Sequence, residues 1–265
     1  MNRLLQIEIN KIRTYHTFWI LTGLYLVILL GIFLSGKLFI DFLVSKGEQF
    51  NNIDLKNIPI YAFPDIWQNM AYVSGFLKFI MAIYVIISIT NEINYNTLRQ
   101  NIIDGMSRGD FLVSKLMLIF ILSLISTVFL LLCGLGFGLL NTQKSQLHYI
   151  FQYTQFLPGH FLQLSTYLIF ALFIGLLIKR SGLAMGLLFL YTLIIEPLIT
   201  FRIKIEWIKG LFPLKAINNL IRFPFKKYAL REIQDYIAWH DLLIVVLWAV
   251  LLTWFIYLLL RKRDL

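Results

Sequence analysis

Six long runs of apolar residues constrain this 265-residue chain more than any other feature of its sequence. A helix that crosses about 30 Å of hydrocarbon needs about 20 mostly apolar residues. Strands are not expected in such runs, because an open sheet would leave backbone groups unpaired in lipid. The sequence therefore predicts an all-α integral membrane protein with six transmembrane helices. The runs cover residues 17–34, 69–90, 111–140, 161–178, 183–200 and 242–260.

The composition agrees with one membrane domain over residues 1–265. Hydrophobic residues make up 59% of the chain and charged residues only 14%, against about 25% charged in soluble domains. In a soluble protein, the net charge of +10 would suggest nucleic acid as a partner. Here many Lys and Arg residues flank apolar runs, so we expect membrane lipid and no nucleic acid as a partner. The single cysteine, Cys133, excludes an internal disulfide.

The placement of Lys and Arg residues bears on orientation, since loops on the cytoplasmic side collect them. With the N-terminus inside, the two sides carry nearly equal numbers, and the long basic segment 201–240 opposes this orientation. The turn at Lys179 and Arg180 and the run Arg261 to Arg263 directly flank apolar runs, where basic residues weigh most. We therefore expect both termini in the cytoplasm and the chain in the inner (cytoplasmic) membrane.

The N-terminal segment has an amphipathic pattern. On a helix, Leu5, Ile9 and Ile12 share one face, and Arg3 and Arg13 lie on the opposite one. This pattern predicts an interfacial helix on the inner leaflet; the alternative is a frayed basic tail. The aromatic and basic segment 201–240 similarly predicts short external re-entrant or interfacial helices before the last span.

Residues 91–110 form the most polar stretch that we expect in the cytoplasm. Asn91 or Asn94 is a candidate N-cap for a short helix. Gly105 is a candidate C-terminal residue, because glycine accepts positive φ. A short polar helix between two spans suits the docking of a soluble partner, and an ordinary solvated loop is the alternative.

Two charged residues fall within the apolar runs, where charge is costly and usually has a partner or a function. Glu196, followed by Pro197, is either a gate or substrate-facing carboxylate on a translocation path, or a structural partner of Arg202 or an external lysine. Lys78 lies near the middle of the second run and is, with Glu196, a candidate residue of a gate or translocation path. It either pairs with Glu196 or extends toward the interface, or the span is shifted so that Lys78 lies shallower. For Lys78 we favour a structural role.

Residues 91–115 resemble the cytoplasmic coupling region of ABC-2-type transporter permeases. That family shows an acidic residue after span two, a Gly-Thr step, a short helix, a Ser-Arg pair and a lysine entering span three. The matching residues are Glu92, Thr97, Ser107, Arg108 and Lys115, while Asn96 replaces the glycine. The segment FPLKAINNLI, residues 212–221, resembles the external re-entrant region of the family.

The resemblance implies the permease subunit of an ATP-driven ABC exporter. Such permeases form a homodimer or a related heterodimer, and each subunit pairs with a separate ATPase subunit. By this resemblance residues 95–103 form a coupling helix, Arg99 donates an ion pair to the ATPase, and Leu98 and Ile102 are apolar anchors. The implied ATPase-coupling residues are Glu92, Tyr95, Thr97, Leu98, Arg99, Ile102, Ser107 and Arg108.

Several motifs of soluble enzymes are absent from the sequence. The chain contains no G-x-x-x-x-G-K-[ST], H-E-x-x-H or G-x-S-x-G pattern. We therefore expect no enzyme activity and no bound cofactor or metal, with ATP and Mg²⁺ held by the partner ATPase. The alternatives are an intramembrane protease or lipid-modifying enzyme that uses Glu196 and a histidine, and a membrane scaffold that transports nothing.

Overall fold

A computed structural model describes residues 8, 11, 13–47, 49–50, 53–54, 58–224 and 236–262. Its described part is almost wholly helical. The exception is a pair of two-residue antiparallel strands, β1 (Gln49–Phe50) and β2 (Ile53–Asp54), in the connection after the first long helix. The prediction of an all-α membrane protein is confirmed at this level.

Within the described ranges, five helices are long and apolar enough to cross a membrane. The second of the six expected runs, 69–90, is divided between α3 (Ile66–Phe76) and α4 (Lys78–Asn94), which bend by 45° at Leu77. Counting this pair as one broken span gives six. The five continuous helices are α2 (His16–Ser45), α6 (Arg108–Asn141), α7 (Phe156–Ile178), the helix Ser181–Arg202 and α13 (Trp239–Lys262).

The helix Ser181–Arg202 changes its winding partway along. It begins as α8 (Ser181–Leu190), continues as the π-helix η3 (Tyr191–Ile195) and ends as α9 (Glu196–Arg202). Pro197 lies directly after the π-helical turn. Since proline has no backbone N–H, the regular hydrogen-bond ladder is interrupted there.

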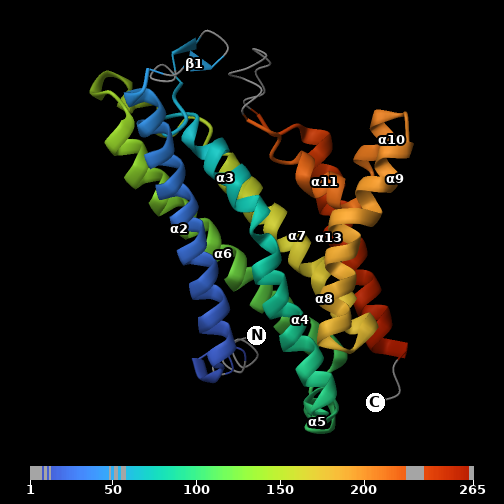
Figure 1. The fold of residues 1–265 in the computed structure, drawn as a ribbon. Helices are drawn as coiled ribbons and strands as arrows, with labels where there is room; N and C mark the ends of the chain where they lie inside the picture. Colours follow the sequence, from blue (N-terminus) through green and yellow to red (C-terminus); the bar gives the residue numbers. More distant parts are fainter. Residues whose placement is uncertain are drawn as a thin grey trace.

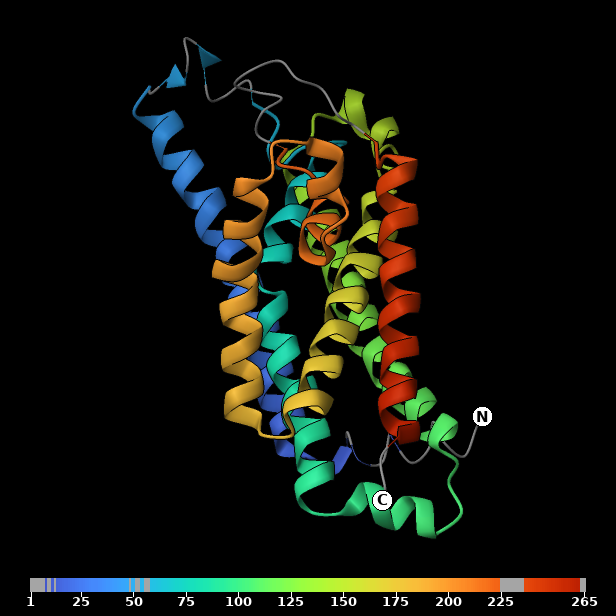
Figure 2. The same cartoon turned by 90° about the vertical axis from the view of Figure 1, so that its right-hand side faces the viewer.

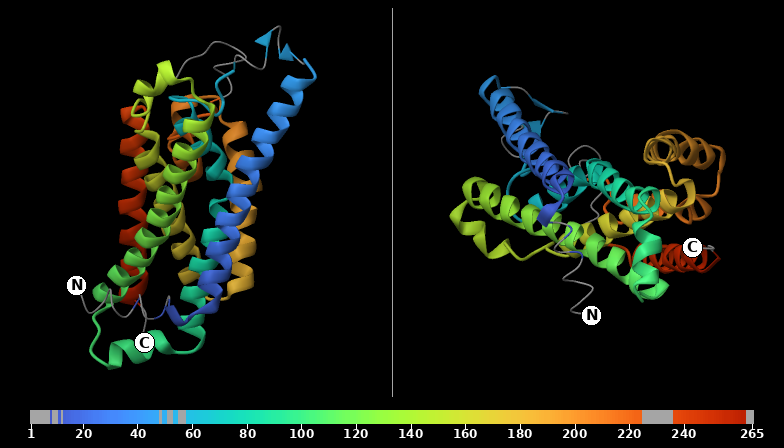
Figure 3. Two further views of the ribbon diagram at one scale, coloured as in Figure 1. Left: turned by 90° about the vertical axis from the view of Figure 1, so that its left-hand side faces the viewer. Right: turned by 90° about the horizontal axis from the view of Figure 1, so that it is seen from below.

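The helix α7 contacts α3, α4, α6, α8 and α13, whereas α2 packs on α4 and α6 at the outer side of the bundle (Figure 1). In the most apolar stretch of α7, 61% of the residues are buried, against 17% in α13. At one end of the bundle α5 (Thr97–Ile103) runs across the base, where α2 begins and α13 ends (Figures 2 and 3). At the opposite end lie the strands, η2 (Lys144–Tyr149), α10 (Glu206–Gly210) and α11 (Pro213–Asn219).

Two glycines of α6 allow α3 and the chain before it to approach closely. A Cβ on Gly134 would lie less than 3.0 Å from the Trp67 ring, and one on Gly138 would lie equally close to the Phe63 ring. Gly136, between them, faces open space. The aromatic rings therefore pack directly on the helix backbone, as small residues permit in membrane helix pairs.

The predicted segments near the two ends of the chain are described in part. Leu5, Ile9 and Ile12, which define the expected interfacial helix, lie outside the described residues. Glu8, Lys11, Arg13 and Thr14 are helical. In the aromatic and basic segment, α10 and α11 are short helices, and α11 coincides with the stretch 212–221 that the sequence singled out.

Candidate functional site

The short helix α5 begins at a residue in the left-handed conformation. Asn96 has φ 56° and ψ 16° and precedes Thr97, the first residue of α5. Glycine adopts this conformation without steric cost, and asparagine is among the few other residues that tolerate it. The structure thus explains how Asn96 stands in the place of the glycine. Asn91 and Asn94 belong to α4, so neither is the N-cap that we expected.

The end of α5 and the start of α6 are set by two local devices. Gly105 has φ 93° and lets the chain turn after α5, as predicted. Ser107 and Asp110 then form a capping box at the start of α6. In it, the Asp110 amide donates to Ser107 Oγ at 3.0 Å and the Ser107 amide donates to Asp110 Oδ2 at 3.3 Å.

The side chains of α5 divide into a buried face and an exposed face. Leu98 is 2% exposed and belongs to the core of this chain, while Ile102 is half-buried against that core. Ile103 is 75% exposed, and Arg99 is exposed too. Tyr95, also 75% exposed, follows the last residue of α4, so the short helix begins at Thr97 and not at residue 95 as expected. The expected anchor role of Leu98 is therefore corrected, because helix periodicity turns Leu98 inward, away from a partner. The exposed apolar groups are Tyr95 and Ile103.

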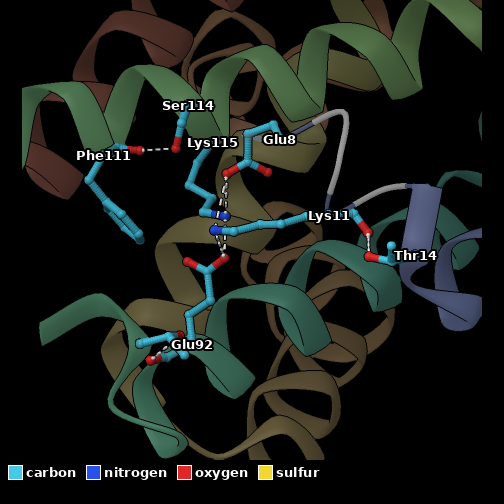
Figure 4. Close-up of polar contacts among 8 residues, drawn as sticks. Glu8, Lys11, Thr14, Glu92, Phe111, Ser114 and Lys115 are labelled. Atoms are coloured by element: carbon cyan, nitrogen blue, oxygen red, sulfur yellow. Dashed lines mark hydrogen bonds and ion pairs between the residues drawn. The ribbon is translucent and has the colours of Figure 1, made fainter. Parts of the chain in front are cut away.

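Four charged side chains form a cluster beside α5, which we call the ionic junction: Glu8, Lys11, Glu92 and Lys115 (Figure 4). Lys115 Nζ lies 2.7 Å from Glu92 Oε1 and 2.9 Å from Glu8 Oε1. Lys11 Nζ lies 3.0 Å from Glu92 Oε1 and 3.7 Å from Glu8 Oε1. The two lysines thus balance the two carboxylates, and Lys115, Glu8 and Glu92 are all buried.

The ionic junction joins three parts of the chain. Glu92 lies near the end of α4, Lys115 lies in the first turns of α6, and Glu8 and Lys11 come from the segment before α2. Sequence reasoning identified Glu92 and Lys115 by resemblance but missed Glu8. The available signal was the spacing of Glu8 and Lys11, three residues apart, which places opposite charges on one helix face.

Two further contacts tie the ends of α5 to the bundle. Thr97 Oγ1 donates to the backbone carbonyl of Glu92 at 3.1 Å. Arg108 donates from Nη1 to the backbone carbonyl of Arg261, near the end of α13. The expected residues Glu92, Thr97, Ser107 and Arg108 therefore hold the loop that carries α5, whereas Arg99 points outward from it.

The second expected site, formed by Lys78 and Glu196, is organised by α11. Glu196 is buried and accepts hydrogen bonds from the backbone amides of Leu214 at 3.1 Å and Lys215 at 2.5 Å. A carboxylate at a helix N-terminus satisfies amides that lack a partner within the helix. Glu196 thus binds backbone groups, and the expected pairing with the side chain of Arg202 or an external lysine is corrected.

Lys78 contacts the same short helix. Its Nζ donates to Asn218 Oδ1 at 2.5 Å and lies 5.0 Å from the centre of the Tyr167 ring. Among the described residues no carboxylate oxygen lies within 4.0 Å of Lys78 Nζ, so the expected direct pair with Glu196 does not form. The helix α11 instead links the two residues, since Glu196 holds its start and Lys78 its end.

A buried histidine bears on the alternative of an intramembrane enzyme. Both ring nitrogens of His160 are hydrogen-bonded, Nδ1 to Ser74 at 3.1 Å and Nε2 to Ser126 at 2.9 Å. Ser126 also bonds Tyr25 at 2.6 Å. Both oxygens of Glu196 bind backbone amides of α11, so His160 and Glu196 each link helices of the bundle. In the described part of the chain no three His, Cys, Asp or Glu residues are grouped to hold a metal.

The bundle of apolar helices, crossed at one end by a short helix with an ionic junction beside it, defines an integral membrane protein. The chain belongs to the ABC-2 transporter family. The family model described as "ABC-2 family transporter protein" matches residues 4–195, which include α5 and all four residues of the ionic junction. No curated protein matches the sequence.

Proposed function

We propose that this chain is the permease subunit of an ATP-driven exporter and that α5 is the element through which a separate ATPase subunit moves it. The family supplies membrane components of transporters that work with an ABC ATPase. The observation that carries the proposal is the construction of α5. It exposes Arg99 and Ile103, and both of its ends are fixed to long helices.

The ionic junction supports a mechanical role for α5. A push on α5 reaches α4 and α6 together, because Glu92 and Lys115 hold the adjoining turns of these two helices at 2.7 Å. Without that contact, the loop 95–107 could bend, and a movement of α5 would not be transmitted to α4 and α6. The junction also includes Glu8 and Lys11, so the segment before α2 moves with the same unit.

The exposed side chains indicate what the ATPase surface offers. Arg99 requires carboxylate or carbonyl acceptors, which its planar guanidinium binds in pairs. Ile103 and Tyr95 require an apolar hollow. ATP and Mg²⁺ bind to the ATPase, and the full assembly contains two permease subunits, identical or related, and two ATPase subunits.

The proposal places α5 and both termini on the cytoplasmic side of the inner membrane, with six spans. Lys179 and Arg180 connect α7 to α8 at the α5 end of the bundle, and Arg261 and Lys262 end α13 there (Figure 2). Basic residues that flank spans favour the cytoplasmic side. In this orientation α10 and α11 lie outside, where they cover the far end of the translocation path.

Co-purification tests the proposal. The full-length chain is expressed with the ABC ATPase of its own organism, and ATPase bound to the tagged permease is quantified. We expect Arg99→Glu and Ile103→Asp to reduce the bound ATPase by roughly tenfold each, as loss of interface anchors does. Lys209→Glu, at the opposite end, is the matched control. Full binding by both α5 variants would contradict the proposal.

A further inference from the structure

A cavity of about 290 Å³ opens beside the bend between α3 and α4. The bend lies about halfway along the bundle, far from α5 (Figure 1). The walls come from α3, α4, α7, α8, η3 and α11. Two polar groups in these walls, Lys78 and Gln163, have bonding capacity that the described part of the chain does not use.

Lys78 is a buried cation with no carboxylate in direct contact among the described residues, although the buried Glu196 lies close enough to act on it electrostatically. The residue is 7% exposed, and its ammonium group bonds the neutral amide of Asn218 and faces the ring of Tyr167. An ammonium group has three N–H donors. A charge buried in a span is costly unless it is paired, so an anion that enters the cavity is stabilised by Lys78.

Gln163 presents an acceptor without a donor. The residue is 4% exposed, and its Nε2 donates to the carbonyl of Ile217 at 3.2 Å, which fixes the direction of the amide. Its Oε1 has no hydrogen-bond partner among the described residues. Gly75 leaves this oxygen uncovered, because a Cβ there would lie 3.2 Å from it. A buried acceptor of this kind favours a ligand with a hydroxyl or amine donor.

The mouth of the cavity is apolar and lies on the outer surface of the subunit. Phe76 and Leu193 line it and are mostly exposed. The rings of Phe79 and Phe189 pack with their centres 5.4 Å apart beside them. In a membrane protein such a surface meets hydrocarbon, so the mouth suits an acyl chain better than a dissolved ion.

We propose that this cavity binds the head group of an anionic amphiphile that carries a hydroxyl or amine donor. The anionic group lies against Lys78, the donor bonds Gln163 Oε1, and the acyl chain leaves past Phe76 and Leu193. The proposal rests on the proposed function, because it identifies this amphiphile as the substrate class of the exporter.

Three probes separate the chemical requirements of the site. Phosphatidylglycerol has a phosphate, hydroxyl donors and acyl chains. Phosphatidylmethanol keeps the anionic phosphate and the chains but has no donor, and glycerol phosphate keeps the head group without chains. The dissociation constant of each probe is measured for the purified full-length chain in detergent by native mass spectrometry. We expect phosphatidylglycerol to bind at least roughly tenfold more tightly than either of the others.

Substitutions then test the two groups. Lys78→Gln and Gln163→Leu should each weaken phosphatidylglycerol binding by roughly tenfold. Lys179→Gln, which removes an exposed charge from the α7–α8 turn, is the matched control. Gly75→Val keeps both polar groups but covers Gln163 Oε1, so it should weaken binding as well. Thermal unfolding without lipid identifies any variant that fails to fold. Only the folded variants are compared with the wild type for phosphatidylglycerol binding.

Equal phosphatidylglycerol affinity in the wild type and the folded variants would overturn the proposal. If glycerol phosphate bound as tightly as phosphatidylglycerol, the claim that the ligand is an amphiphile would be overturned, and the site would bind a dissolved anion instead. Equal binding of phosphatidylmethanol would overturn the donor requirement. No ATPase is present in this assay, so a failure of α5 to bind an ATPase leaves these results unchanged and is detected separately.

Discussion

Lys115 and Glu92 lie 23 positions apart in the chain, and their side chains meet at 2.7 Å on either side of the loop that carries α5. Lys115 also binds Glu8 from the segment before α2. One buried lysine therefore gathers three segments at the end of the bundle. This arrangement fixes the loop that carries α5 to the adjoining ends of α4 and α6.

Lys115→Met should destabilise the protein more than loss of any other member of the ionic junction, because it leaves Glu8 and Glu92 buried with only the half-exposed Lys11 between them. Breaking a buried ion pair costs about 3–5 kcal/mol. Lys37→Met is the matched control, since its pair with Asp41 is more exposed and such pairs contribute about 1 kcal/mol or less. Thermal unfolding in detergent measures both. Equal shifts for the two variants would contradict the prediction.

Asn96→Gly should retain stability, while Asn96→Ala should lower it by about 1–2 kcal/mol. The backbone at Asn96 is left-handed. This conformation costs about 1–2 kcal/mol for alanine, whereas glycine has no Cβ and asparagine has a short polar side chain, so both tolerate it. Hydrogen exchange of the α5 amides should rise in Asn96→Ala alone. The neighbouring Tyr95→Ala, with an exposed side chain, is the control. Faster exchange in Asn96→Gly would show that the conformation is not the cause.

Glu196→Ala should loosen α11 without unfolding the bundle. The substitution removes a charged acceptor from the amides of Leu214 and Lys215, and bonds to charged groups contribute about 1.5–3 kcal/mol each. Hydrogen exchange at these two amides should accelerate. Glu206→Ala, at an exposed carboxylate in the adjacent α10, should leave them unchanged. Unchanged exchange in Glu196→Ala would mean that other contacts hold α11.

Gly138→Ala should destabilise the protein and Gly136→Ala should not. An added Cβ at position 138 meets the Phe63 ring, whereas one at 136 meets open space. Overpacking costs about 1–3 kcal/mol, and an unobstructed Gly→Ala change in a helix gains up to about 1 kcal/mol. The two variants have the same composition, so their unfolding temperatures compare directly. Equal temperatures would argue against close packing of Phe63 on α6.

The sequence predicted the helices well because length and hydrophobicity alone decide which segments span a membrane. It did not predict the bend at Leu77, since the run 69–90 is apolar on both sides of it and contains no proline. Nor did it decide which face of α5 is buried. Leu98 and Ile102 share a face by periodicity, but only the packed helices show that this face turns inward.

The contacts of the charged residues depend on segments far apart in the chain. Glu8 and Lys115 are separated by 107 positions, and Lys78 and Asn218 by 140. Sequence spacing carries no information on such pairs. The cost of burying Lys78 and Glu196 indicated that partners exist. The neutral and backbone character of those partners, Asn218 and the start of α11, became apparent only in the folded chain.

Site-specific photo-crosslinking most directly tests the claim that α5 is where an ATPase subunit holds this permease. A photoreactive amino acid replaces Ile103 on the exposed face of α5, or Trp207 at the opposite end of the bundle, and both are exposed side chains. On irradiation of the co-expressed proteins, the account predicts a covalent permease–ATPase product from position 103 and none from position 207. A product from position 207 alone, or from neither position in a co-purified complex, would contradict it.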